Sequence, residues 1–390
     1  MVSSKDTAIG IEPQSLLGID VGDLKLRGAL STAEEIAQQP AVWREVLAQV
    51  RLNRASIDSW LDDRLSLPRV QVLFCGAGTS AFIGDTLAPW LRKDFESTNP
   101  ISFESVSTTS LVASPQQYLG DDRPTLMVSF ARSGDSPESV AAVELADSML
   151  SDCSHLIITC NPNGKLADYA ERSTKSLILH LPERTNDRGF AMTSSYTSML
   201  VACASVFGRE AAAMEAVCSM ADNVISERVP DIARVAQGEF DRLVVLGAGA
   251  LEGTAQEFAL KCIELAAGKL VGISNTPLGL RHGPKIVITS ETVVVLLVSN
   301  DPYTQQYDRD LLDELRSEGK AGSIIELSSK SLFPDYYETI EDAWMSLVYI
   351  VYGQIFAFLK AYSLGVTVDS PCPSGEVNRV VQGVTIHPFS

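Results

Sequence analysis

An internal repeat constrains the fold of this chain more than any other feature of its sequence. An apolar run over 72–75 breaks into Gly76-Ala77-Gly78, and the same pattern returns over 243–249, so that Gly247 follows Gly76 by 171 positions. Two more strand-like runs, over 126–129 and 155–159, recur over 295–299 and 322–326 at nearly the same offset. Such repetition predicts an α/β chain of two tandem units, each a parallel sheet flanked by helices.

The two copies differ in the loops that follow their strands. Only the first carries Arg132-Ser133-Gly134-Asp135-Ser136, and only the second carries Arg281-His282-Gly283-Pro284. Ligands of parallel α/β sheets bind beyond the carboxyl ends of the strands, where both loops fall. The chemistry of the chain is therefore expected in these loops.

The repeat also suggests how the chain is divided. We predict a helical lead-in over 1–68, a first unit over 69–210, a second unit over 211–368 and a C-terminal strap over 369–390. The first thirty residues are weakly patterned, which predicts an extended or partly disordered start. Ser31-Thr32-Ala33-Glu34 has the pattern of a capping box, so a helix is expected to open there and to end at Pro40, which suits the first turn of the next helix.

Strands and helices are predicted to alternate through both units. In the first unit the expected strands are 70–75, 101–106, 125–130, 155–160 and 176–181, and the expected helices are 79–92, 109–119, 136–150 and 193–207. Helices within 210–237 lead to the second unit, which begins at Leu243 and ends in an apolar helix over 340–362. That helix is long enough to span a membrane, but polar residues interrupt it, so we expect it to be buried between domains or subunits.

The charge of the chain argues against two classes of partner. With 31 basic and 49 acidic residues the formal net charge is −18, which repels nucleic acid and anionic membranes. A phosphorylated metabolite is repelled at long range too, so loop N–H groups, hydroxyls and a helix N-terminus would have to hold it. We expect a small-molecule partner, and neither nucleic acid nor a membrane.

The cysteines and histidines give no sign of a metal site. The seven cysteines form no C-x-x-C pair and lie mostly in apolar runs, which is typical of reduced thiols in a cytosolic protein. His155, His180 and His387 are scattered, with no H-x-x-x-H pair and no Cys/His cluster. Met1 to Gly10 has no basic start followed by an apolar core, so no signal peptide is read and a cytoplasmic location is expected.

Hydroxyl-rich loops are the first candidate site. Ser136 and Pro137 make a good helix start, which explains part of the 132–136 loop, but a helix start needs neither Arg132 nor Ser133. A phosphate cradle explains both, and Thr79 and Ser80 at the neighbouring strand end favour it. Thr193 and Ser194 either cap the last helix of the first unit or complete a polar pocket for a sugar.

A dinucleotide site is the rival interpretation of the first loop. Gly76-x-Gly78-x-x-Ala81 formally matches the dinucleotide fingerprint, with Glu104 as the ribose-binding acid. A single match of this kind is weak, and it leaves the loop after the third strand unexplained. A dehydrogenase is therefore the less favoured alternative.

Two segments of the second unit carry titratable side chains that could act in acid–base chemistry. Glu257, Lys261 and Glu264 share one side of a predicted helix, and the ordinary interpretation is a solvated face with a Glu257–Lys261 pair. His282 lies in a turn-rich segment where an imidazole is a poor core residue, and histidine is well suited to move a proton near neutral pH.

These motifs together resemble the double sugar-isomerase (SIS) family. Residues 75–80 resemble its Cys-Gly-Thr-Ser loop with an insertion, and 132–136 resemble its Ser-Gly-Glu-Thr phosphate loop. The segment 259–264 is similar to the one bearing the family's general base, and 281–284 to its Lys-His-Gly-Pro loop. Over nearly the whole chain the likeness is to the AgaS subfamily of galactosamine-6-phosphate deaminase/isomerases, also called tagatose-6-phosphate ketose/aldose isomerases, with 190–195 and 369–379 as the most specific markers.

The resemblance implies an enzyme that converts galactosamine 6-phosphate to tagatose 6-phosphate and ammonia without a cofactor. His282 would open the pyranose ring, and Glu264 would move the C2 proton to C1 before water hydrolyses the ketimine. The residues that would bind the sugar phosphate are Thr79, Ser80, Arg132, Ser133, Ser136, Thr193 and Ser194. A homodimer or higher homo-oligomer is implied as well, because in related sugar isomerases the His-Gly-Pro loop reaches a neighbouring subunit's site.

The chain departs from the amino-sugar synthase of the family in two ways. Gln382 stands where the synthase supplies a lysine, and no glutaminase domain precedes the strand expected at residue 70, so we expect nitrogen to be removed rather than added. Isomerisation of a hexose phosphate without deamination is the main alternative. A non-catalytic sugar-phosphate sensor is another, although binding alone would need neither Glu264 nor His282.

Overall fold

The computed structural model describes residues 14–95, 101–121, 123–208, 214–336 and 339–389. The described part opens with a short antiparallel pair and a helix: β1 (Ser15–Leu16), β2 (Ile19–Asp20) and α1 (Val21–Leu26). The prediction of an extended start is therefore wrong from residue 14 onward, and its remainder concerns residues 1–13, outside the described residues. Leu24 is the buried residue of α1, so an apolar contact holds this segment on the core.

Two parallel sheets confirm the predicted tandem repeat. The first consists of β3 (Gln71–Gly76), β4 (Ser102–Ser107), β5 (Thr125–Ala131), β6 (Cys153–Thr159) and β7 (Ser176–His180), and the second of β8 (Arg242–Leu246), β9 (Val271–Asn275), β10 (Thr292–Leu297) and β11 (Ser323–Leu327). The spatial orders are β4-β3-β5-β6-β7 and β9-β8-β10-β11. Counted from its own first strand, each sheet runs 2-1-3-4, and among the described residues only the first sheet adds a fifth strand.

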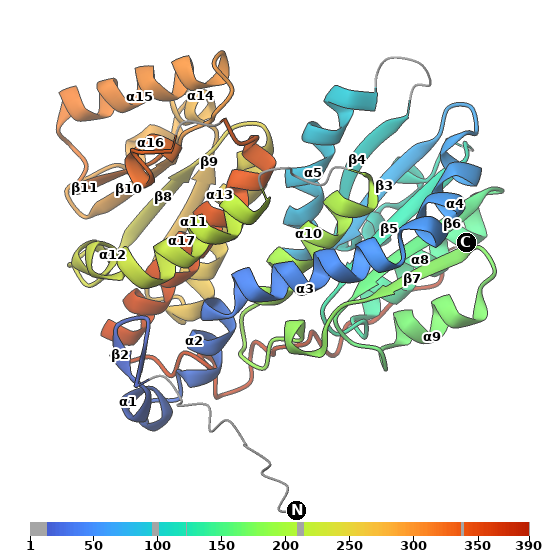
Figure 1. The fold of residues 1–390 in the computed structure, drawn as a ribbon, viewed down its shortest axis with the longest axis horizontal. Helices are drawn as coiled ribbons and strands as arrows, with labels where there is room; N and C mark the ends of the chain where they lie inside the picture. The colour runs from blue at the N-terminus through green and yellow to red at the C-terminus, as the bar shows by residue number, and fades with distance from the viewer. Residues whose placement is uncertain (1–13, 96–100, 122, 209–213, 337–338, 390) are drawn as a thin grey trace, which may run out of the picture.

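Helices cover both sheets (Figure 1). The lead-in forms α2 (Leu30–Ala37), α3 (Gln39–Leu52) and α4 (Arg54–Leu65). The first unit adds α5 (Thr79–Phe95), α6 (Thr108–Ala113), α7 (Pro115–Tyr118), α8 (Pro137–Met149), α9 (Lys165–Arg172) and α10 (Ser194–Val206). The rest are α11 (Met214–Glu227), α12 (Val229–Ala236), α13 (Ala250–Leu265), α14 (Pro277–Leu280), α15 (Thr304–Glu318), α16 (Ser329–Leu332) and α17 (Asp342–Ser363). The single helix predicted over 109–119 is two helices, because Pro115 begins a new one after Ser114.

The predicted capping box does not form. Helix α2 begins at Leu30, one residue before the box, and its cap residue makes no side-chain hydrogen bond. The N–H groups of Ser31 and Thr32 instead donate to the carboxylate of Asp369, at 3.1 and 2.8 Å. The C-terminal strap thus supplies the acceptor that helix starts require.

Helix α17 lies at the centre of the molecule. It packs on α11, α12 and α13 and also contacts α2 and α5, so it touches elements of the lead-in and of both units. Although its length and composition would suit a membrane span, 94% of its most apolar window is buried inside the chain. The prediction of a helix buried between domains is confirmed, and the chain needs no second copy to cover it.

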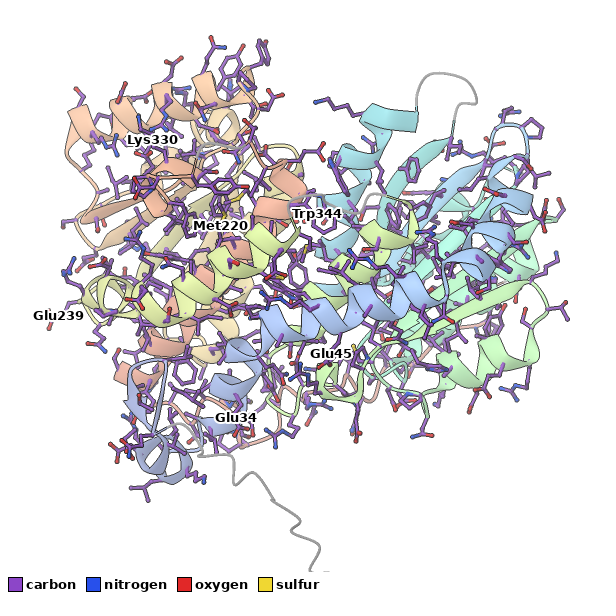
Figure 2. The ribbon with its side chains drawn as sticks, viewed as in Figure 1. Glu34, Glu45, Met220, Glu239, Lys330 and Trp344 are labelled. Atoms are coloured by element: carbon purple, nitrogen blue, oxygen red, sulfur yellow. The ribbon has the colours of Figure 1, made fainter. Side chains whose placement is uncertain are left out.

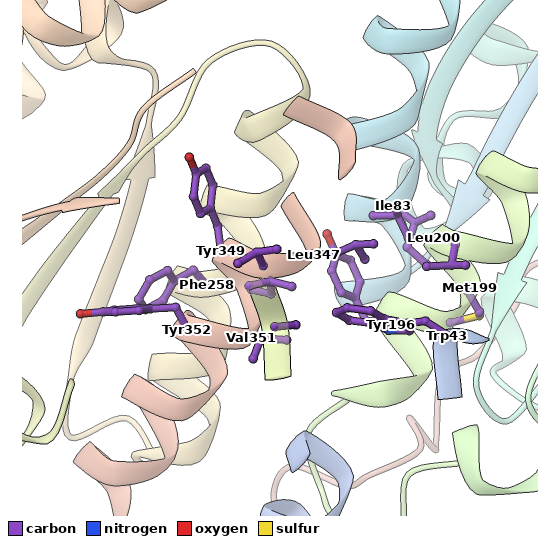
Figure 3. Packing of buried hydrophobic residues seen from close by; sticks show 14 of the residues in the cluster. Trp43, Ile83, Tyr196, Met199, Leu200, Phe258, Leu347, Tyr349, Val351 and Tyr352 are labelled. Carbon is purple, nitrogen blue, oxygen red and sulfur yellow. The ribbon is translucent and has the colours of Figure 1, made fainter. Parts of the chain in front are cut away.

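One hydrophobic cluster is continuous through both units. Figure 3 shows Phe258 and Tyr352 at one end of it and Trp43 and Tyr196 at the other. Charged side chains such as Glu45, Glu239 and Lys330 are exposed, and Figure 2 shows Glu239 at the left edge of the molecule.

Candidate active site

The candidate site begins where the strand order of the first sheet reverses, between β3 and β5. These strands pair in parallel, with Cys75 opposite Ser129, so the loops that follow them start side by side. Such a switch point, beyond the carboxyl ends of the strands, is where ligands of open α/β sheets bind. Two of the three predicted hydroxyl clusters lie here: 133–136 on the loop after β5, and 79–80 at the start of α5, directly after the loop from β3.

The loop after β5 is shaped to receive an anion. Gly134 has a φ of +72°, which suits glycine, and the side-chain amide of Asn161 donates to the Ser133 carbonyl at 2.7 Å. The Ser136 hydroxyl pairs with that of Ser139 at 2.6 Å, and within the described residues no side chain caps the start of α8. The first-turn N–H groups of this 13-residue helix therefore lack a side-chain acceptor, which favours the phosphate cradle over the self-capped helix.

Helix α13 of the second unit reaches this loop by packing on α5. The contact needs a glycine, since a Cβ on Gly253 would lie 2.6 Å from the Phe82 carbonyl oxygen. The two helices run in opposite directions, so the end of α13 meets the start of α5. There the ammonium of Lys261 donates to the Thr79 hydroxyl at 3.0 Å.

The charged face of α13 is buried, so the prediction of a solvated face is wrong for two of its three residues. The side chains of Glu257 and Lys261 are 0% exposed, and that of Glu264 is 26% exposed. The Lys261 ammonium lies 3.4 Å from a Glu257 oxygen and contacts a Glu264 oxygen more closely. Glu264 is thus held on one side by an ammonium and remains accessible on the other.

The electrostatics of this trio follow from burial and pairing. Burial raises the pKa of Glu257 to about 8, although the Lys261 ammonium opposes the shift. Burial alone would lower the pKa of Lys261, but Glu257 and then Glu264 outweigh it, and the pKa of Lys261 is raised. Lys261 is therefore a permanent cation at the boundary between the two units.

Arg132 adds a second buried cation beside the phosphate loop. Its guanidinium donates to the Phe190 carbonyl at 3.0 Å and to the carbonyl of Arg379 in the strap. Burial lowers the pKa of Arg132, and the charge of Arg379 lowers it further, whereas Asp187 and Glu264 oppose the shift. A chain that is acidic overall thus gathers cations where a phosphate would need them.

The third hydroxyl cluster has a partner inside the protein. Asp187 accepts six hydrogen bonds, one from the N–H and one from the hydroxyl of each of Thr193, Ser194 and Ser195. All three residues are fully buried. These contacts support the capping interpretation of Thr193 and Ser194, because both hydroxyls already donate to Asp187.

His282 has no hydrogen bond or ion pair with a residue of the site in the described part of the chain. It is exposed, in the turn between α14 and a 3₁₀ helix (Pro284–Val287), and no hydrogen bond in the described part of the chain involves its imidazole. Lys285 on the same turn contacts Glu314 of α15 instead. Ser80, by contrast, is buried beside the site, with its hydroxyl 3.8 Å from the sulfur of Met192.

The position of Glu104 argues against the dinucleotide interpretation, which needs it as the ribose-binding acid. Glu104 pairs with Leu73 inside the sheet rather than lying at a strand end, and its carboxylate binds Arg123 at 3.0 Å. A ribose hydroxyl would have to displace that partner.

Three residues that shape the candidate site were not predicted from the sequence: Lys261, Asp187 and Arg379. A signal existed only for Lys261, whose spacing from two glutamates on an otherwise apolar helix could equally have indicated a buried network. Asp187 precedes its hydroxyl partners by six residues without a local motif. Arg379 donates to the Asp187 carbonyl at 3.1 Å from 192 residues away, which no local pattern encodes.

Comparison with known proteins gives consistent results. Residues 67–209 match the SIS domain family. A D-galactosamine-6-phosphate deaminase AgaS from Shewanella sp. (strain ANA-3) is 43% identical over 389 residues, covering 100% of both chains. The structure of a tagatose-6-phosphate ketose/aldose isomerase from Escherichia coli superimposes with a TM-score of 0.83 at 39% identity, covering 92% of this chain and 96% of the other. A structure from Clostridium novyi NT, provisionally described by the same activity, gives a TM-score of 0.90 at 39% identity, covering 97% and 100%.

Proposed function

The chain belongs to the AgaS family of SIS-domain proteins, and we propose that it is a galactosamine-6-phosphate deaminase that yields tagatose 6-phosphate and ammonia. The observation that carries this proposal is the 43% identity to a deaminase of that name over the full length of both chains. The placement of Glu264 and Lys261 at the switch point of the first sheet supports it. The two names found among relatives describe one aldose-to-ketose conversion with and without loss of the amine.

The proposed reaction uses groups of the chain itself. Ser133, Ser136 and the start of α8 bind the 6-phosphate, with Arg132 close by. In the open-chain sugar, Glu264 takes the C2 proton and returns it to C1, while one proton of the C2 ammonium passes to the aldehyde oxygen. The aldehyde thus becomes a hydroxymethyl group and the ammonium a ketiminium. Water adds to C2, the C–N bond breaks, and ammonia leaves the ketose phosphate. Lys261 holds the Glu264 carboxylate in place throughout.

Ring opening is assigned to His282, and its exposed position supports a composite site in a homo-oligomer. The exposed imidazole is accessible to the pocket of a second copy. We also propose a cytoplasmic location and retain the division of the chain into units over 69–210 and 211–368.

The test is an assay for ammonia and ketose over a panel of sugar phosphates. We expect galactosamine 6-phosphate to give ammonia and tagatose 6-phosphate in equal amounts, and glucosamine 6-phosphate to react more slowly. Conversion of tagatose 6-phosphate to an aldose without any ammonia from either amino sugar would establish the isomerase alternative. Binding of both amino sugars without turnover would establish the sensor.

A further inference from the structure

We propose that the first unit binds a zinc ion between α8 and β6, with Asp147, Cys153 and His155 as ligands. The Nε2 atom of His155 lies 2.9 Å from an Asp147 carboxylate oxygen and 3.6 Å from the Cys153 sulfur. The three donor atoms all lie within 4.8 Å of one another. The sequence-based expectation that no Cys/His cluster exists is therefore wrong in three dimensions.

The fold brings these residues together through two short-range rules. Cys153 and His155 are two apart on strand β6, so their side chains lie on the same face of the sheet. Asp147 lies in the last turn of α8, the helix that leads into β6. Three different ligand types thus come from nine consecutive residues, a signal that a search for C-x-x-C or H-x-x-x-H patterns does not detect.

The distances suit tetrahedral zinc. Bonds of about 2.3 Å to sulfur and about 2.0 Å to nitrogen and oxygen place donor atoms roughly 3.3–3.6 Å apart. The sulfur–nitrogen distance of 3.6 Å already has this value. The oxygen–nitrogen distance of 2.9 Å is that of a hydrogen bond, so zinc would require the exposed Asp147 to move outward by about 0.4 Å.

The surroundings of Asp147 resemble the outer shell of a metal site, whereas the buried Nδ1 of His155 has no partner among the described residues. The Tyr169 hydroxyl donates to the second Asp147 oxygen at 2.5 Å, which leaves the first oxygen directed at His155. Ligating carboxylates are commonly held in this way. The Asp147 side chain is 43% exposed whereas that of His155 is 0% exposed, so an ion can enter from solvent and keep a water as its fourth ligand.

The three donor groups favour zinc over other divalent ions. A thiolate, a carboxylate and a neutral imidazole balance the charge of a divalent ion, and thiolate with imidazole favours zinc over calcium or magnesium. A hydrogen-bonded His155–Asp147 pair would explain the shorter distance without a metal. The metal adds to that pair a third ligand, the Cys153 sulfur, which the strand already places 3.6 Å from the same imidazole nitrogen.

The site is remote from the proposed chemistry. Cys153 pairs with Thr125 at the amino end of β5, and Thr159 pairs with Ala131 at the carboxyl end, just before Arg132. Cys153 and Thr159 are six residues apart on β6, which places the two ends of the strand roughly 20 Å from each other. The zinc would therefore brace α8 and β6 without contacting the sugar.

The experiment titrates chelator-treated protein with Zn²⁺ and Co²⁺. We expect one ion per chain and, with Co²⁺, a thiolate-to-metal charge-transfer band in the near ultraviolet. Cys153→Ser should abolish the band, and both Cys153→Ser and Asp147→Asn should weaken zinc binding by more than the 10- to 100-fold that losing an outer-shell partner costs. The matched control is Cys218→Ser, a buried cysteine of α11, which should change neither result.

Two outcomes would overturn the proposal. One is zinc affinity that is the same in the wild type and in Cys153→Ser, and the other is bound Co²⁺ without the thiolate band. Asp147 is partly exposed, so Asp147→Asn tests the site even if Cys153→Ser does not fold. Turnover of the amino-sugar phosphate should be unchanged in both variants, so failure of the zinc site leaves the proposed function untouched.

Discussion

Lys261 lies where the two units meet, with its ammonium between Glu257 and Glu264 of its own helix and the Thr79 hydroxyl of the first unit. A buried cation of this kind is tolerated only when its partners are present. It fixes the carboxylate proposed as the proton carrier and joins the phosphate-binding unit to the one that carries the base.

Above pH 8, where Glu257 is ionised, replacing Lys261 with methionine should destabilise the protein, because it leaves the buried Glu257 carboxylate without its cation. Loss of one member of a buried pair costs about 3–5 kcal/mol of unfolding free energy. The double variant Lys261→Met/Glu257→Gln, measured by urea denaturation, should recover most of the loss. Equal losses in the single and double variants would mean that Lys261 stabilises the chain by packing alone.

Glu264→Gln should remove the base while keeping the shape of the side chain. We expect kcat to fall on the order of 100- to 10,000-fold with little change in substrate affinity. Glu252→Gln, at the exposed start of the same helix, is the matched control and should retain full activity. Turnover of Glu264→Gln at the wild-type rate would exclude it as the proton carrier.

The charged face of α13 shows what could be predicted from the sequence about single residues and what could not. Helical spacing correctly placed Glu257, Lys261 and Glu264 on one face, but spacing says nothing about what covers that face. Here α5 covers it, and that contact depends on Gly253, whose importance becomes visible only when both helices are placed.

Among the elements, the loop between β5 and α8 can be tested by its hydroxyls. Ser133→Ala should remove a charge-assisted hydrogen bond of about 1.5–3 kcal/mol, which lowers kcat/KM for the phosphorylated sugar by about 10- to 150-fold. The loss should vanish with the unphosphorylated sugar. Ser148→Ala, at the exposed end of α8, serves as the control, and equal losses on both substrates would indicate a damaged loop instead.

Helix α2 braces the loop that carries Asp187, and this contact should make stability depend on pH. The buried Glu35 accepts from the N–H groups of Arg188 and Gly189, at 2.5 and 3.2 Å. Burial, followed by the charge of Asp187, raises the pKa of Glu35 from 4.5 to about 8. The folded chain therefore binds a proton that the unfolded chain releases between these values, and stability falls as pH rises through this window.

Glu35→Gln should remove that dependence. Urea titrations of the wild type between pH 5 and 8 should include a slope of up to about 1.4 kcal/mol per pH unit from this group, and the variant should lose it. A wild-type slope that persists in the variant would assign the effect to another buried acid, such as Glu257.

Element types were largely predictable, but their partners were not. The alternation of strands and helices follows from local patterns, whereas the order 2-1-3-4 depends on how the sheets assemble. The capping box failed for the same reason, since Asp369 lies 338 residues from the helix start that it caps.

For the whole molecule, oligomerisation rests on His282 and no longer on α17, which the chain buries by itself. If His282 serves a neighbour's pocket, then mixing Glu264→Gln chains with His282→Ala chains should restore activity. Random exchange in a dimer gives half mixed pairs with one intact site each, or up to about a quarter of wild-type activity per site. Proven exchange without recovery would mean that both residues act within one chain.

The strap that caps α2 has a consequence for synthesis. The N–H groups at the start of α2 find their acceptor at Asp369, and the central helix of the core ends at Ser363. Asp369 and helix α17 have not yet been synthesised while the ribosome is still making the second unit. The first unit therefore emerges with much of its apolar surface uncovered. We expect this chain to fold after release rather than unit by unit, and to depend on chaperones during translation.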